Sequence, residues 1–240
     1  MSPELSDFGS FYSYRIAVYA IGVSTVKRRA YRSPQREAQA EATRQAIRDA
    51  ARRLFSSRGY AATTREAIAT EAGVAVQTVY AVFGRKRNIL FALLDQMPLD
   101  ADLAGYRERL AAAGGDPHRQ LGEVLAFSAR MYGGSSDVTE LARTIAGADQ
   151  DLAELWREGE QRRYRAASEL VADWRARGLL QPELGIAQAT DILWAFAGPD
   201  TFRLLVRERR WSRSRYQAWV CAMLERELFA SPAPARRVAP

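Results

Sequence analysis

The chain has 240 residues, and 48% of them are hydrophobic, which is enough apolar surface for one large or two small globular domains. Cys221 is the single cysteine and His118 the single histidine. An intrachain disulfide, a cysteine-based zinc finger and a multi-histidine metal site are therefore excluded. A reducing, cytoplasmic location fits this cysteine usage.

The formal net charge is +7, but it is unevenly distributed. Residues 27–90 carry 14 basic and 5 acidic side chains, whereas residues 91–230 carry 18 and 21. A basic segment before a larger, mildly acidic one is typical of a protein with separate nucleic-acid-binding and other functions. The alternative is a basic surface that only keeps the protein soluble.

Residues 1–26 differ in composition from the rest because they are rich in aromatic and apolar side chains and poor in charge. The apolar run from Ile16 to Val26 is too short to span a bilayer, and no basic cluster precedes it as in a signal peptide. We therefore expect no membrane association. We interpret this segment either as a poorly ordered arm or as an artefact of start assignment, with synthesis beginning near Val26. A basic lead-in follows, formed by Lys27, Arg28, Arg29, Arg32 and Arg36.

A first helix is predicted over residues 37–57, with an apolar stripe along it and Gly59 after its end. Thr63 and Glu66 then have capping-box spacing, which predicts a second helix that starts at Thr64. Gly73 can adopt the left-handed conformation that ends this helix. The pattern predicts a pair of short helices joined by a tight turn.

The second helix of this pair is predicted from Ala75 to Phe83. Its apolar spacing predicts a buried face that includes Val79, Tyr80 and Phe83, and an outward face of small or polar residues. Small side chains at a helix N-terminus allow it to enter the major groove, where Gln77 can bind adenine and Thr78 can contact phosphate or a thymine methyl group. The spacing therefore indicates a helix-turn-helix that reads DNA.

The stretch from Thr63 to Lys86 resembles the N-terminal DNA-binding domain of the TetR family of transcriptional regulators, over a matched region of roughly residues 42–90. The resemblance is carried by Thr63-Thr64, Ile68-Ala69, Ala72-Gly73-Val74, Thr78-Val79-Tyr80, Phe83 and Lys86. Two positions differ: Ala75 stands where the family often has Ser, and Val82 where it often has His or another aromatic residue. Two possible phosphate contacts are therefore absent.

The resemblance implies an all-α protein with a three-helix helix-turn-helix domain and a larger helical domain for effector binding and dimerisation. It also implies a set of DNA-contacting residues, namely Arg44, Thr63, Thr64, Ala75, Val76, Gln77, Thr78, Tyr80 and Lys86. In this set Gln77 and Thr78 carry sequence preference, while Tyr80 and Lys86 position the helix. Arg44 approaches the DNA backbone or is simply solvated.

Four regions are expected: an N-terminal arm over 1–36, the helix-turn-helix domain over 37–85, the larger helical domain over 86–230, and a disordered Pro-rich tail over 231–240. In the larger domain, helical periodicity runs between Gly and Pro breaks. Pro98 is expected to break or kink the helix that begins at Lys86. Further helices are predicted over 101–112, 117–132, 138–146, 149–177, 185–209 and 212–229.

The last two predicted helices have more large apolar residues than packing against the core of one subunit requires. We expect them to pair with their counterparts in a homodimer, with Trp194, Phe202, Leu205, Trp219 and Met223 at the interface. The alternative is that both helices serve only the core of one subunit. A pocket for an unknown apolar or amphipathic effector is expected among the helices of the larger domain, lined by Phe127, Met131, Trp156, Tyr164 and Trp194.

No catalytic motif, cofactor motif or metal-ligand cluster is evident, so we expect neither an enzyme nor a bound cofactor. The function that fits best is a transcriptional regulator, a ligand-responsive repressor that binds a palindromic operator on double-stranded DNA as a dimer. One alternative is a helical small-molecule-binding or interaction protein with weak or no specific DNA binding. Another is an enzyme on a helical scaffold.

Overall fold

The computed structural model describes residues 34–147 and 149–230. The expectations for the arm over residues 1–33, including Lys27, Arg28, Arg29 and Arg32, and for the tail over 231–240 lie outside these residues. The described chain is α-helical apart from one isolated antiparallel bridge between Leu180 and Phe229. The predicted all-α class is therefore confirmed.

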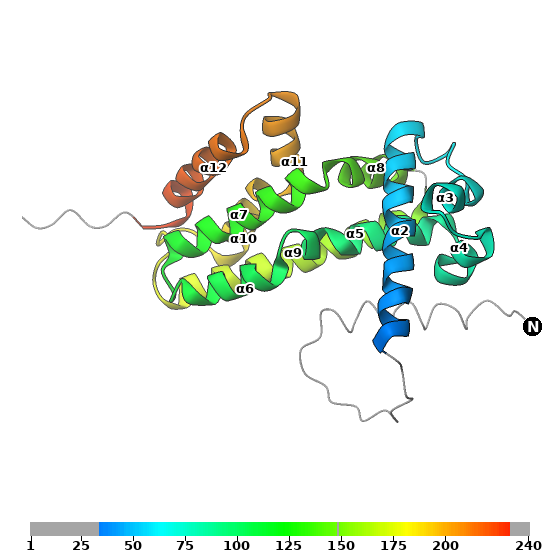
Figure 1. Ribbon diagram of the computed structural model, residues 1–240. Helices are drawn as coiled ribbons and strands as arrows, with labels where there is room; N and C mark the ends of the chain where they lie inside the picture. The colour runs from blue at the N-terminus through cyan, green and yellow to red at the C-terminus, as the bar shows by residue number, and fades with distance from the viewer. Residues whose placement is uncertain (1–33, 148, 231–240) are drawn as a thin grey trace, which may run out of the picture. The chain divides into compact units, whose positions relative to one another are not determined.

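The chain divides into two compact units, residues 1–46 and 47–240. Helix α2 (Pro34–Arg58) begins in the first unit and ends in the second (Figure 1). In the first unit, Arg44 lies 3.7 Å from the carboxylate of Glu41 on the same helix. The predicted bounds of this helix were close to the observed ones, and Gly59 follows its end with a positive φ of 80°.

The second unit opens with a small helical cluster, in which α2 is followed by α3 (Arg65–Ala72) and α4 (Val76–Phe83). Each helix contributes apolar side chains to one core, and most of these are less than about a twentieth exposed. The buried members from these helices are Ile47, Ala50, Ala51, Leu54, Phe55, Ile68, Ala69, Val79 and Phe83. The apolar stripe predicted for the first helix is thus buried.

Helix α5 (Lys86–Asp100) follows α4 and adds Ile89 and Leu90 to the same core. Pro98 lies inside this helix, which continues to Asp100. Pro98 therefore does not break this helix, and the alternative that it kinks the helix stays a prediction. Pro98 has no N–H to donate to the carbonyl of Leu94, so one backbone hydrogen bond is missing there, and the helix continues for only two more residues.

The larger helical region continues with α6 (Leu103–Ala112), α7 (Pro117–Gly134), α8 (Ser136–Ala146) and α9 (Gln150–Ala176). Side chains of Asp116 and Asp149 accept backbone N–H groups at the starts of α7 and α9. Such caps satisfy donors that the first helical turn leaves unpaired. The four predicted segments correspond to these helices, with small shifts at the ends.

The helix predicted over 185–209 is in fact three elements: α10 (Ile186–Phe196), α11 (Pro199–Phe202) and the π-helix η1 (Arg203–Glu208). Gly198 is extended, with φ −88° and ψ 171°, and Pro199 has no N–H to continue the ladder. In η1 the amide of Arg209 reaches the carbonyl of Leu204 at 3.0 Å. The prediction of one continuous helix was therefore wrong.

Helix α12 (Arg213–Leu228) closes the described chain and packs against α7 and α10, while α9 packs against α8 and α10 (Figure 1). Trp174 of α9 is fully buried, and its indole N–H donates to Gln120 of α7 at 2.7 Å. The ring of Trp174 meets the ring of Phe229 edge to face, with 5.0 Å between centroids. Within the described residues, no helix is both long and apolar enough to cross a membrane.

Candidate nucleic-acid interface and ligand cavity

The start of α3 is capped by Thr64. Its hydroxyl accepts the amide of Ala67 at 3.1 Å, and its backbone is extended, as an N-cap requires. Thr63 is buried instead, and its hydroxyl donates to the carbonyl of Gly59 at 2.8 Å. The capping box predicted from Thr63 and Glu66 was wrong by one residue. Thr63 tethers the loop before α3, and Thr64 remains exposed at the helix start.

The turn between α3 and α4 depends on Gly73, which has φ 67° and ψ 32°. Its amide donates to Thr70 at 3.2 Å, and the next amide, of Val74, donates to Ala69 at 3.0 Å. This pair of bonds is the Schellman arrangement, which needs a left-handed residue at the glycine position. The predicted turn is confirmed, and it determines how α4 leaves α3.

Helix α4 has one buried and one exposed face. Val79 and Phe83 are at most 2% exposed. The exposed residues are Ala75, Gln77, Tyr80 and Ala81, with Val76 and Thr78 half-buried. Tyr80 is 43% exposed, so its expected place on the buried face was wrong. Burial of its neighbour Val79 turns the Tyr80 ring outward, because successive residues are about 100° apart around a helix.

Arg65 is a residue of this surface that sequence reasoning missed. Its guanidinium lies over the Tyr80 ring, 4.0 Å from the centroid, and donates to the carbonyl of Gly84 at 3.0 Å. The first residue of α3 thus holds the last turn of α4. The sequence signal was an arginine directly after the N-cap, where a cation is unfavourable beside the helix dipole and so needs another role.

Lys86, expected at phosphate, is bound by the protein. Its ammonium donates to the carbonyls of Tyr60 at 2.6 Å and Thr63 at 2.8 Å, and it lies 4.2 Å from the centroid of the Tyr60 ring. Burial lowers the pKa of the Lys86 ammonium, and the charge of Arg65 lowers it further. One ammonium hydrogen remains for an outside acceptor. Lys86 therefore supports the loop that precedes α3.

We expect Lys86→Met to lower thermal stability, because it leaves two carbonyls without their charged donor. The side chain is only partly buried, so the loss should be about 1 kcal/mol, or roughly 2–4 °C in Tm. Calorimetry at a fixed protein concentration measures the change. Arg85→Met is the matched control, since Arg85 is exposed and caps no amide with its side chain. Equal Tm values for wild type and Lys86→Met would refute this role.

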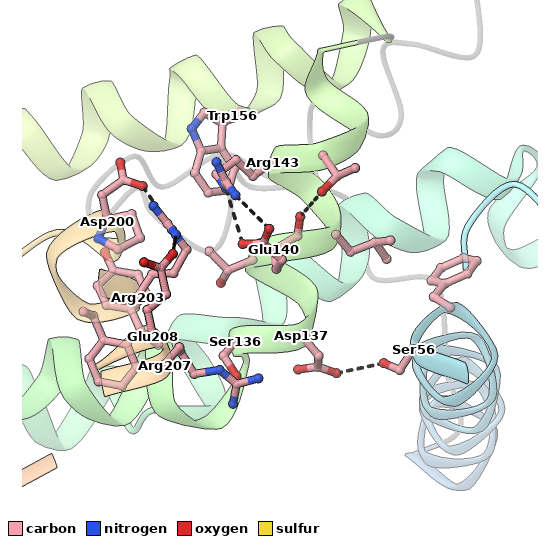
Figure 2. A pocket seen from close by; sticks show the side chains of 17 residues that line it. Ser56, Ser136, Asp137, Glu140, Arg143, Trp156, Asp200, Arg203, Arg207 and Glu208 are labelled. Carbon is pink, nitrogen blue, oxygen red and sulfur yellow. Dashed lines mark hydrogen bonds and ion pairs between the residues drawn. The ribbon is translucent and has the colours of Figure 1, made fainter. Parts of the chain in front are cut away.

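A cavity of about 530 Å³ lies in the second unit, lined by residues from α2, α7, α8, α9, α11 and η1. Figure 2 shows the charged and aromatic side chains that project from several of these elements into the cavity. Its apolar lining consists of Phe55, Tyr132, Leu141, Trp156, Pro199 and Phe202. This volume falls in the range of small-molecule sites, about 300–1,000 Å³.

Of the five residues expected to line an effector pocket, Trp156 alone lines this cavity. Phe127 stacks on Tyr106, with 4.4 Å between centroids, and Tyr164 donates to Asp191 at 3.1 Å. Trp194 lies under the guanidinium of Arg163, and Met131 packs against the core. These four side chains therefore lie outside this cavity, because helical spacing identifies apolar residues but cannot distinguish core packing from a lining. Their place in an effector pocket stays a prediction.

The carboxylates that line the cavity are all engaged by arginines. Glu140 binds Arg143 at 2.7 Å, Glu208 binds Arg203, and Asp200 lies 3.8 Å from Arg203. Asp137 is held by Arg52, which lies outside the lining. Figure 2 draws the contacts of Glu140, Glu208 and Asp200 with these arginines as dashed lines. The cavity is therefore far more polar than the predicted apolar pocket.

Arg52 links α2, the first helix of the helix-turn-helix domain, to the start of α8 beside the cavity. We call this helix-turn-helix domain the reading domain. Its guanidinium donates twice to the carboxylate of Asp137, at 2.8 and 2.7 Å, and once to the carbonyl of Gly134 at 2.5 Å. Ser56, one turn further along α2, donates to the same carboxylate at 3.3 Å (Figure 2). Burial raises the pKa of Asp137, but the hydrogen bond and the charge of Arg52, together with backbone N–H groups at the start of α8, outweigh this effect, so the pKa is lowered. The pair is charged at neutral pH.

The residues expected at a dimer interface fall into two groups. Phe202 is 2% exposed and packs on Tyr132 and Tyr216, with centroid distances of 6.0 and 5.2 Å. Its assignment to the interface was wrong, because it fills the core of one subunit. Trp219 is 45% exposed, and Trp194, Leu205 and Met223 are half-buried. For these four, the interface remains a prediction.

Residues 47–93, which contain α3, the Gly73 turn and α4, match the family model described as bacterial regulatory proteins, tetR family. These residues belong to the TetR family. The HTH-type transcriptional regulator HbdR from Aromatoleum sp. (strain CIB) is 32% identical over 143 residues. That match covers 59% of this chain and 62% of HbdR, so the chain spans less than two thirds of the relative's length.

Solved structures extend the similarity beyond the TetR-family segment. NalD, described as the secondary repressor of the MexAB-OprM multidrug efflux pump in Pseudomonas aeruginosa, has a TM-score of 0.63 at 24% identity, covering 79% of this chain and 98% of NalD. SmeT in complex with triclosan has a TM-score of 0.65 at 19% identity, covering 83% and 99%. At these identities the likeness establishes a shared fold.

Proposed function

We propose that this chain is a DNA-binding transcriptional regulator, a ligand-responsive repressor that binds a palindromic operator as a dimer. The observation that carries the proposal is the outward face of α4. Ala75 and Ala81 leave room for close approach to the bases, and Gln77 is exposed between them. A glutamine presented by a helix in the major groove can make two hydrogen bonds to adenine.

The other expected DNA contacts have supporting roles. Thr64 is exposed at the start of α3, where hydroxyl and amide groups suit a phosphate. Arg65 braces Tyr80 and brings a positive charge to the same surface. Lys86 has one ammonium hydrogen left for a phosphate, and Arg44 is proposed to approach the DNA backbone. Thr63 is buried, so it acts on the loop rather than on DNA.

The relatives support regulation by a small molecule. HbdR is named a transcriptional regulator, NalD a repressor, and SmeT was solved with triclosan bound. An effector can release DNA only if it prefers a conformation in which the two reading helices of a dimer do not fit adjacent major grooves. Our proposed contacts between the two subunits are the exposed Trp219 and the half-buried Trp194, Leu205 and Met223.

A salt titration tests the proposal. The purified protein is titrated onto a fragment from the promoter of its own gene and onto a scrambled fragment of equal length. A regulator should retain a sequence-specific component near physiological salt, typically about 10³-fold or more over random DNA. A protein with only a basic surface should lose all binding as salt rises. Equal affinity for both fragments would support the non-regulatory alternative.

We expect Gln77→Ala to change base preference at one position of each half-site and to reduce preferred-site affinity by about 1–3 kcal/mol, because the bidentate contact is lost. Selection from a randomised DNA pool measures the preference. Gln188→Ala is the control, since Gln188 is exposed on α10 in the larger domain. If both variants select the same sites as the wild type, Gln77 does not read bases.

A further inference from the structure

One charged group of the cavity beside α2, the guanidinium of Arg207, has no hydrogen-bond partner among the described residues, although its charge helps to lower the pKa of Glu140. Within residues 34–147 and 149–230, Arg207 makes no hydrogen bond or ion pair, whereas each carboxylate of the lining is held by Arg52, Arg143 or Arg203. A guanidinium has five N–H donors and no acceptor. The cavity therefore offers unused hydrogen-bond donors to an anion, whereas its carboxylates each lie within ion-pair distance of an arginine.

The element that presents Arg207 is itself unusual. Arg203, Arg207 and Glu208 all line the cavity and all lie on the π-helix η1. Single turns of π-helix are rare and occur often at functional sites. The wider winding places residues four and five apart on one side, and this arrangement allows Arg203 to bind Glu208 while Arg207 stays free.

The rest of the lining suits an apolar tail. Six of its residues are aromatic, aliphatic or proline, and they come from α2, α7, α8, α9 and α11. Trp156 contributes an indole N–H with no partner among the described residues, so it can donate to a ligand. Burial of a hydrocarbon chain against these side chains is favourable in proportion to the area removed from water.

We propose that this cavity binds an amphipathic carboxylate, with its head group on Arg207 and its chain against the aromatic wall. A single negative charge fits better than a phosphate, because four carboxylates already line the site and would repel a dianion. The ligand class refines the effector of the proposed function and rests on that proposal for its effect on DNA. Binding itself does not depend on it.

The cavity also gives the ligand access to the reading domain. Phe55 and Ser56 of α2 line it, together with Asp137, the carboxylate that Arg52 grips. A carboxylate bound to Arg207 adds a negative charge to the cavity, which repels the carboxylate of Asp137 and attracts the guanidinium of Arg52. The ligand thus acts on the contact that holds the last turns of α2 against the start of α8.

Calorimetric titration of the full chain with octanoate, 1-octanol and octyltrimethylammonium tests the proposal, since the three probes share a chain and differ in charge. We expect octanoate to bind once per subunit and more tightly than the other two. Arg207→Gln should weaken octanoate by about tenfold and leave octanol unchanged, because a charged hydrogen bond is lost. Arg207 is exposed, so the variant should fold like the wild type.

Arg209→Gln is the matched control, since Arg209 is exposed just beyond η1 and does not line the cavity. The proposal is overturned if octanoate shows no binding at millimolar concentration, if octanol or octyltrimethylammonium binds as tightly, or if the Arg207 and Arg209 variants behave alike. The same proteins are then titrated onto the promoter fragment. Octanoate binding without specific DNA binding would reject the proposed function alone, and the reverse would reject the ligand class alone.

Discussion

Replacing Gly73 by alanine should reduce specific DNA binding by at least about tenfold and lower the free energy of unfolding by about 1–2 kcal/mol. The stability loss is the cost of a left-handed conformation in a residue with a Cβ atom. The binding loss has a different cause. The residue at φ 67° determines the direction in which α4 leaves α3. An alanine is strained at this φ, and if the backbone relaxes to relieve that strain, α4 rotates relative to α3. Equilibrium unfolding and DNA titration measure the two effects separately.

Gly178 provides a matched control for this experiment. It has φ 69°, its amide donates to Arg175, and the amide of Leu179 donates to Trp174, which repeats the bonds made around Gly73. A Cβ atom would meet nothing within 4 Å at either glycine. Gly178→Ala should therefore cost similar stability and leave DNA affinity unchanged. If the two variants lose DNA binding equally, the effect of Gly73→Ala is one of general stability.

Trp174→Ala should be the most destabilising substitution considered, with a loss of about 3–5 kcal/mol in the free energy of unfolding. The side chain is fully buried between α7 and the chain beyond α12, where it touches Phe229 and donates to Gln120. Its removal leaves a large cavity and an amide oxygen without its donor. Chemical denaturation at a fixed protein concentration measures the change, because the stability of a protein that dimerises, as we propose for this chain, depends on concentration.

Trp174→Phe separates the two contributions in this experiment. The phenyl ring keeps much of the packing but cannot donate to Gln120, so the loss should be about 1–3 kcal/mol from the unpaired group and the smaller volume. A denaturation midpoint for Trp174→Ala equal to that of the wild type would show that this region is not part of the cooperative core. Equal losses for the two variants would assign most of the effect to the hydrogen bond.

The reading domain could be predicted in detail because its determinants are local. Gly73 ends a helix through its own backbone freedom, and the apolar spacing of Ile68 and Ala69 places them on one face. The error at the start of α3 was a shift of one residue in the predicted N-cap. Thr63 and Thr64 compete for the same cap, and only the packing of the preceding loop, which takes the Thr63 hydroxyl, decides between them.

The cavity could not be predicted in the same way. Its lining joins Phe55, Trp156 and Arg207, which are separated by about 50 to 100 positions in the sequence. Helical spacing identified many aromatic residues, yet Phe127 and Tyr164 are occupied with partners of their own. Whether an aromatic side chain packs, pairs or lines a space depends on neighbours contributed by other helices.

The amino-acid pattern was sufficient for the helical class, the positions of most helices and the reading motif, because periodicity, caps and glycine turns act over a few residues. The arrangement of side chains from distant helices settled the rest. It buried Phe202, turned Tyr80 outward and engaged Lys86 with backbone carbonyls. It also left Arg207, in the cavity, without a hydrogen bond or ion pair to any other described residue. These outcomes depend on which side chains fill the space between helices and on which charged groups lie close to one another in the folded chain. Short-range sequence patterns do not encode either.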